Sequence, residues 1–88
     1  MKWKYTYEMV DIDKRVSAIP VGDGADKFHA VANLNQTALD LFMLLQEDRT
    51  EDELIGLMQE KFEVSRDILA RDVRNCIKVL MESGFIAA

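Results

Sequence analysis

Two side chains that often carry chemistry in proteins, a histidine and a cysteine, each occur once in this 88-residue sequence. His29 has no Cys or Asp partner at the spacing of a metal site, which favours a strand side chain that faces solvent or a partner. Cys76 falls on the apolar stripe of an expected helix, where a cysteine usually packs as a small hydrophobe. A nucleophilic thiol needs a nearby base, and the sequence around Cys76 offers none.

Two further segments are candidates for catalysis or phosphate binding: the acidic run Glu51–Glu53 and Gly22-Asp23-Gly24. Neighbouring carboxylates can act as an acid and a base, but acids directly after Thr50 are typical of a helix start, where the dipole favours negative charge. The glycine segment lacks the spacing of a phosphate-binding loop. We therefore expect a chain that is not an enzyme and that needs no metal or other cofactor.

Three basic residues, Arg71, Arg74 and Lys78, follow the i, i+3, i+7 spacing that places them on one face of a helix. They form either a solvated face or an electrostatic guide for an acidic peptide or a phosphate backbone. The net charge of −5 and the pI near 4.7 argue against a non-specific nucleic-acid binder, which needs a basic footprint. A winged-helix DNA-binding protein with this helix in the major groove remains an alternative.

The composition predicts one globular domain over residues 1–88, because 49% of the residues are hydrophobic and 31% are charged. A single cysteine excludes an internal disulfide and is compatible with a reducing compartment. The N-terminal residues lack the apolar core of a signal peptide, and no apolar run is long enough to cross a membrane. We expect a cytoplasmic protein that does not bind membranes.

The first third of the chain has the period of β-strands. Apolar residues alternate over Trp3–Met9, and Asp11–Lys14 has the composition of a turn. Arg15–Val21 predicts a second strand, and Gly22–Asp26 has turn chemistry. Phe28–Leu34 predicts a third strand. Its helix-facing residues are expected to be Ala30, Ala32 and Leu34, with His29, Val31 and Asn33 on the other side.

The rest of the chain has helical period, and its capping residues predict where three helices begin. Asn35 should cap a helix over residues 36–46, Thr50 and Glu53 form a capping box for the next, and Ser65 should cap a helix over residues 66–83 that stops at Gly84. We expect a core at Leu41, Leu45, Leu54, Val73, Ile77 and Leu80. The order predicts an α+β fold in which a three-stranded antiparallel sheet (strands within residues 3–34) precedes three helices, as in a winged helix-turn-helix.

The third strand is short and follows a glycine-rich turn. If it lies at the edge of the sheet, its unpaired N–H and C=O groups can pair with a further strand, unless its own side chains protect it. A second copy of the chain is one such partner, which makes a homo-oligomerising module a further alternative.

A set of motifs in a fixed order resembles the PqqD family, named after coenzyme PQQ synthesis protein D. The resemblance covers nearly the whole chain and is strongest from Val31 to Ile86. The motifs are Leu34-Asn35-x-x-Ala38, a leucine-rich helix, Thr50-x-x-Glu53-Leu54, Phe62, Asp72-Val73, and Leu80-x-x-x-Gly84-Phe85-Ile86.

This resemblance implies a peptide chaperone, also called a RiPP recognition element, that binds the leader segment of a ribosomally made precursor. The leader is added as a strand to the third strand, lies against the third helix, and is presented to a modifying enzyme, typically a radical S-adenosylmethionine enzyme. It implies a docking strand of Phe28, His29, Ala30, Val31, Ala32 and Asn33, and a groove wall of Leu69, Asp72, Val73 and Cys76. PqqD proper tends to carry Gly-Trp where this chain has Gly84-Phe85, so the pathway is that of PQQ or of another modified peptide.

Overall fold

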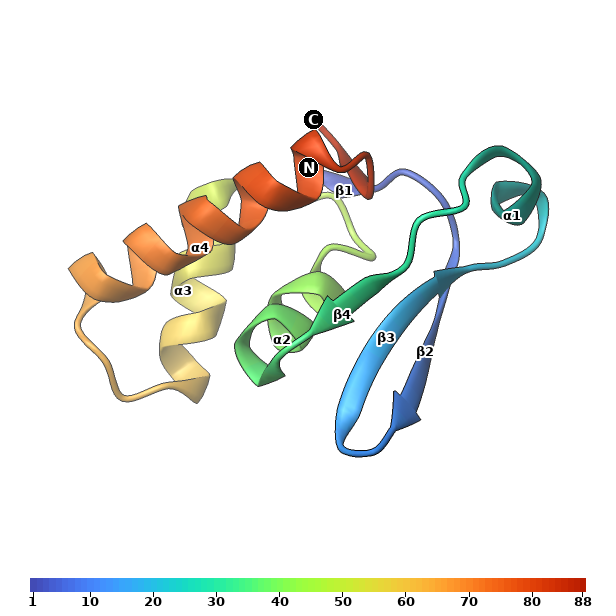
Figure 1. The fold of residues 1–88 in the computed structure, drawn as a ribbon. Coiled ribbons are helices and arrows are strands. Elements are labelled where there is room, and N and C mark those ends of the chain that lie inside the picture. The colour runs from blue at the N-terminus through green and yellow to red at the C-terminus, as the bar shows by residue number, and fades with distance from the viewer.

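The computed structural model describes residues 1–88, which form five strands and four helices (Figure 1). The strands are β1 (Lys2–Trp3), β2 (Tyr7–Ile12), β3 (Arg15–Pro20), β4 (Ala32–Leu34) and β5 (Ile86–Ala87). The helices are α1 (Asp23–Lys27), α2 (Gln36–Leu44), α3 (Glu51–Lys61) and α4 (Arg66–Glu82).

A three-stranded antiparallel sheet has the order β2-β3-β4, which confirms the predicted sheet and the α+β class. The β2–β3 turn is shorter than predicted, because Ile12 pairs with Arg15 and only Asp13 and Lys14 lie outside the ladder. Both turn residues have positive φ, as two-residue hairpin turns require for their twist to match that of the strands.

The predicted third strand over Phe28–Leu34 is wrong in extent, since only Ala32–Leu34 pairs with β3. Ala32 lies opposite Ala18, so a longer β4 would have to run alongside Ile19 and Pro20. Pro20 has no N–H to donate, and β3 ends there. The chain before Ala32 therefore has no partner strand.

The continuous strand predicted over Trp3–Met9 is also wrong, because the chain leaves the ladder between β1 and β2. Trp3 pairs with Ile86, and the amide of Lys4 donates to the carbonyl of Phe85 at 3.1 Å. The two ends of the chain thus form a second, two-stranded sheet, which Figure 1 shows beside the C-terminal end of α4.

The predicted turn at Gly22–Asp26 forms the short helix α1. Gly22 precedes it with a φ of +65°, and Gly24 packs so closely on Tyr5 that a Cβ there would lie 2.9 Å from the Tyr5 Cβ. Gly22 therefore allows the positive φ at the start of α1, and Gly24 allows the close contact with Tyr5.

The three larger helices begin where their caps predicted. Asn35, Thr50 and Ser65 each accept a hydrogen bond from the backbone three residues later, and Thr50 and Glu53 form the complete capping box. Gly84 follows α4 with a φ of +83°, and the amide of Phe85 bonds back to the carbonyl of Leu80 at 2.9 Å. This helix end turns the chain sharply and returns Phe85 to the core.

The core lies between the helices and one face of the sheet. All six predicted core residues are buried. They are joined by a further set that includes Phe42, Ile55, Met58, Phe85 and Ile86. No helix has both the length and the apolar character that crossing a membrane requires.

Candidate functional site

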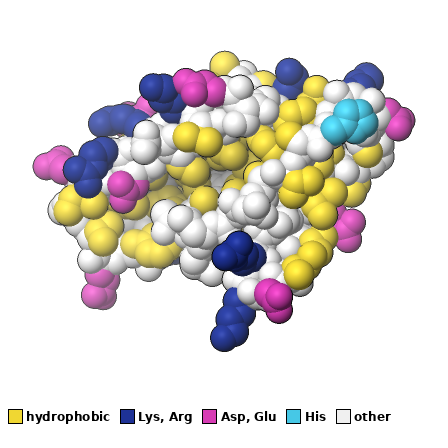
Figure 2. All heavy atoms as spheres, in the orientation of Figure 1, with side chains coloured by type: hydrophobic (Ala, Val, Ile, Leu, Met, Phe, Trp, Pro, Cys, Tyr) yellow, Lys and Arg dark blue, Asp and Glu magenta, His cyan; other side chains and the backbone are white.

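An apolar groove lies between β4 and α4, with a volume of about 280 Å³. We define the β4–α4 groove by its lining residues, eight of which are hydrophobic: Val31, Ala32, Asn33, Leu34, Ala38, Cys76, Val79, Leu80, Ser83 and Phe85. Figure 2 shows hydrophobic side chains gathered between the positions of these two elements on this side of the molecule. Val31 and Val79 are 53% and 58% exposed, which is a high exposure for aliphatic side chains at one site.

The groove exists because β4 is the last strand of its sheet. Its only partner is β3, so the backbone groups along its other edge have no strand to bond to. Small side chains at Ala32 and Ala38 leave space beside this edge, and Cys76 and Val79 of α4 form part of the opposite wall. The third strand thus lies at the edge of the sheet, which was the condition for its pairing with a further strand.

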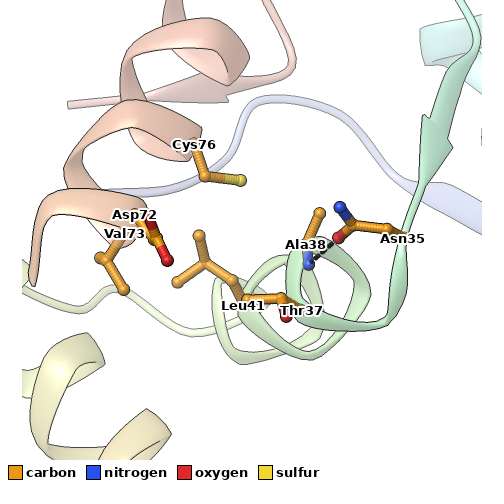
Figure 3. Close-up of a pocket in the computed structure, with 7 residues that line it drawn as sticks. All are labelled: Asn35, Thr37, Ala38, Leu41, Asp72, Val73 and Cys76. Carbon is orange, nitrogen blue, oxygen red and sulfur yellow. Dashed lines mark hydrogen bonds between the residues drawn. The ribbon is translucent and has the colours of Figure 1, made fainter. Parts of the chain in front are cut away.

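A second hollow of about 200 Å³ continues from the groove and shares Ala38 and Cys76 with it. Its lining residues are Asn35, Thr37, Ala38, Leu41, Asp72, Val73 and Cys76, and we call it the Asp72 pocket (Figure 3). The Asn35 carboxamide oxygen is occupied as the N-cap of α2, accepting from the amide of Ala38 at 2.8 Å. Its NH₂ group makes no hydrogen bond within the chain and is available to an acceptor.

Aromatic side chains hold the Phe85 end of the groove in place. Phe85 makes an edge contact with Phe28, and the Phe28 ring stacks on Tyr5. The Tyr7 hydroxyl donates to the Phe85 carbonyl at 2.8 Å. This end of the groove is therefore supported by contacts with the N-terminal segment and with Phe28, the first residue of the predicted docking strand.

The chemistry of the groove is that of a binding surface. Burial raises the pKa of the Cys76 thiol, which lowers the fraction of reactive thiolate. No hydrogen bond joins this thiol to a base, and no three His, Cys, Asp or Glu side chains lie together in a group that could hold a metal ion. The site presents the unpaired backbone edge of β4, apolar walls and one acidic side chain, that of Asp72.

The structure brings together some of the residues implied for a docking strand and groove wall. Val31, Ala32 and Asn33 line the β4–α4 groove, Asp72 and Val73 line the pocket, and Cys76 lines both. Val31 was expected on the face away from the helices, yet it lines the groove that α4 borders, because it precedes the paired part of the strand.

Other implied residues lie elsewhere. Leu69 is only 2% exposed and lines neither hollow, because its position on α4 faces the core. Phe28 caps the C-terminus of α1 and packs among aromatic rings. His29 and Ala30 are exposed in the segment between α1 and β4 and line no hollow, so Ala30 does not face the helices as expected.

The basic residues of α4 surround a separate hollow of about 420 Å³ that is lined by Arg71, Arg74, Asn75 and Lys78. None of these four residues lines the groove or the Asp72 pocket. Arg74 forms an ion pair with Glu51 of α3, and Arg71 lies 3.9 Å from the carboxylate of Asp72.

Several groove residues were not predicted from the sequence to be part of the binding site. They are Leu34, Ala38, Val79, Leu80, Ser83 and Phe85. Val79 carried a usable signal, because it continues the line of Cys76 one turn further and makes the apolar face of α4 wider than the core requires. The other residues read as ordinary core or helix-end positions until the tertiary structure places them beside β4.

Comparisons with known proteins identify one family through a family model and a shared fold through two solved structures. The family model described as coenzyme PQQ synthesis protein D (PqqD) matches residues 9–86. The structure of TbiB1 in complex with the TbiA(beta) leader peptide is similar, with a TM-score of 0.68 and 20% identity over 99% of this chain and 100% of that one. Lasso peptide synthetase B1 complexed with the leader peptide has a TM-score of 0.70 and 17% identity over 99% and 96% of the two chains. No curated protein matches the chain.

Proposed function

The chain belongs to the PqqD family, and from this premise we propose that it is a non-catalytic protein that binds the leader segment of a ribosomally made precursor peptide. The leader adds a strand to the open edge of β4 and lies in the β4–α4 groove. The two structural neighbours described above are complexes with leader peptides, which supports this proposal.

The observation that carries the proposal is the combination of an unpaired strand edge and an apolar groove in one place. Main-chain hydrogen bonds to the edge supply affinity for almost any extended peptide. Alternate side chains of the added strand then enter the groove, and its apolar residues select among peptides.

We propose further that the bound precursor is presented to a peptide-modifying enzyme, such as a radical S-adenosylmethionine enzyme. The site offers no base, metal cluster or activated nucleophile, so a chemical change to the peptide requires a second protein. The family description, which concerns the synthesis of coenzyme PQQ, supports a role beside biosynthetic enzymes.

The test is an NMR titration of the full chain with the synthetic leader of a short precursor encoded beside this gene. We expect amide shifts at Val31–Leu34 and along Cys76–Ser83. Shifts confined to α2 and α3, with β4 unchanged, would contradict the proposal. Light scattering of the chain without peptide tests the alternative that a second copy of the chain pairs with the open edge of β4. A stable dimer that does not bind the leader would support that alternative.

Matched variants locate the peptide. Val79→Arg places a charge in the groove, where it should weaken binding at least about tenfold through clash and desolvation. Val64→Arg makes the same change at a similarly exposed valine, 47% against 58%, which lines no hollow and should bind as wild type. Equal losses in both variants would show that the leader binds elsewhere.

A backbone variant tests strand addition itself. Val31→Pro fixes φ and removes an N–H beside β4, whereas Val31→Ala removes only side-chain atoms. If the leader pairs with the backbone, proline abolishes binding and alanine has a small effect. Circular dichroism of both variants checks that the sheet is retained.

A further inference from the structure

Asp72 introduces one charged group into a site that is otherwise apolar or neutral. The Asp72 pocket adjoins the β4–α4 groove, since Ala38 and Cys76 line both. A peptide strand lying in the groove therefore passes or enters this pocket. The inference that follows rests on the proposed function and concerns which peptides the site selects.

The pocket walls suit a long side chain with an apolar stem and a polar end. Ala38 and Cys76 supply the accessible apolar surface, since Leu41 and Val73 are each only 1% exposed, and Asp72 is the only charged residue among the seven that line the pocket. Figure 3 shows the Asp72 carboxylate directed toward the space between α4 and α2. Lysine and arginine have this character, because their methylene groups pack on apolar surface while the charge reaches a polar partner.

The Asp72 carboxylate has no strong partner within the chain. Its one ionic contact is with Arg71 Nε at 3.9 Å, and the two side chains are 57% and 77% exposed. Adjacent residues on a helix do not face each other, and ion pairs at this exposure add little stability. A cation in the pocket would thus meet an acid that the fold has not already neutralised.

The basic residues of α4 do not neutralise the negative charge of the Asp72 pocket. Arg71, Arg74 and Lys78 surround their own hollow, which shares no lining residue with the Asp72 pocket. The side of α4 that borders the groove presents Asp72, Cys76 and Val79, so its only charge is negative.

The spacing on α4 also defines the spacing on the peptide. Asp72 and Cys76 are four residues apart, or about 6 Å along a helix. Two residues of an extended strand cover about 6.6 Å, and residues i and i+2 point to the same side. A strand that follows α4 can therefore place an apolar side chain at Cys76 and the side chain two positions away at Asp72.

We propose that Asp72 is a specificity-determining residue, which selects leader peptides that carry a lysine or arginine two positions from an apolar residue held in the β4–α4 groove. The cation lies in the Asp72 pocket, with its stem on Ala38 and Cys76 and its charge at the carboxylate. Asn35 lines the same pocket and donates its unused NH₂ to the peptide backbone.

The test uses a displayed library of random twelve-residue peptides selected on the full chain. The wild type should enrich lysine or arginine two positions from an apolar residue, by about fivefold over Asp72→Asn, as one surface ion pair provides. Asp72→Lys should instead enrich aspartate or glutamate at that position. Glu60→Lys makes the same charge change on the exposed surface of α3 and should select as wild type.

The outcomes separate this inference from the proposed function. Enriched peptides that protect the Cys76 thiol from alkylation but show the same charge preference in wild type and Asp72→Asn overturn the role of Asp72 and leave the groove in place. Failure to enrich any peptide that protects Cys76 overturns both. Asp72→Asn keeps the size of the side chain, so it remains informative if Asp72→Lys folds poorly.

Discussion

The hydroxyl of Tyr7 donates a buried 2.8 Å hydrogen bond to the backbone carbonyl of Phe85, which joins the start of the main sheet to the end of the groove. The two residues are 78 positions apart in the chain, and their rings also pack with centroids 5.5 Å apart. The bond fixes Phe85 at the place where the chain leaves α4 and turns into β5.

The first prediction concerns the strength of this link. Tyr7→Phe keeps the ring contacts and removes one donor to the Phe85 carbonyl, which still accepts from the amide of Lys4. The expected cost is therefore that of one hydrogen bond, about 0.5–1.5 kcal/mol in the free energy of unfolding. Tyr5→Phe is the control, because the Tyr5 hydroxyl makes no hydrogen bond in the structure. Urea denaturation measures both, and equal midpoints would contradict the role of the Tyr7 bond.

The second prediction concerns alkaline pH. Burial, with a smaller effect from Tyr5, raises the pKa of Tyr7 from 10.0 to about 12 in the folded chain. Between these values the unfolded chain releases the proton and the folded chain retains it, so folding stability falls as the pH rises from 10 to 12. In a pH titration followed by tyrosinate absorbance, the wild type should show a step near pH 12 that is missing in Tyr7→Phe. A Tyr7 that loses its proton near pH 10 in the folded chain would contradict this.

The third prediction concerns Cys76, whose pKa is raised by burial. Because the thiolate is the reactive form, alkylation of Cys76 should be slow at neutral pH. Its rate should rise at a higher pH than the rate for a solvent-exposed cysteine. A leader bound in the groove should slow it further. Mass spectrometry of the single labelled cysteine gives the rates, with the unfolded chain in urea as the reference. A folded chain that reacts as fast as the unfolded one would contradict the burial.

The fourth prediction separates the core face of α4 from its groove face. Ile77 is 8% exposed, so Ile77→Ala should cost about 2–5 kcal/mol, as large-to-small core substitutions do. Val79 is 58% exposed, and Val79→Ala should change stability by no more than about 0.5 kcal/mol. Thermal unfolding compares the two variants. Similar losses for both would show that Val79 is part of the core.

Sequence reasoning was most reliable where neighbouring residues decide the structure. Asn35, Thr50 and Ser65 cap their helices through hydrogen bonds to amides three residues away, and Gly84 ends α4 with the positive φ that glycine permits. These interactions lie within one turn of chain, so the local sequence is sufficient to predict them. Helical period likewise identified the core face of α4, including Val73 and Ile77.

It was least reliable where the partner is distant. The apolar alternation around Trp3 predicted a strand, but not that this strand ends at Trp3 and pairs with Ile86. Pro20 was expected at a strand end, yet its effect on the length of β4 depends on the register between Ala18 and Ala32. Register is a property of the assembled sheet and is not contained in either strand alone.

The amino-acid sequence by itself determined where the three larger helices begin, the core face of α4 and the resemblance to one family, because caps, periodicity and motif order are local or additive along the chain. It did not determine every helix end, since α2 was predicted to reach residue 46 and ends at Leu44, and it did not predict α1. Only the tertiary structure decided the groove. It placed Val31 beside Val79, removed Leu69 from the site and gave Asp72 a pocket separate from the basic residues on the same helix. The physical reason is that a groove consists of surface left between elements, which depends on where α4 lies relative to the open edge of β4.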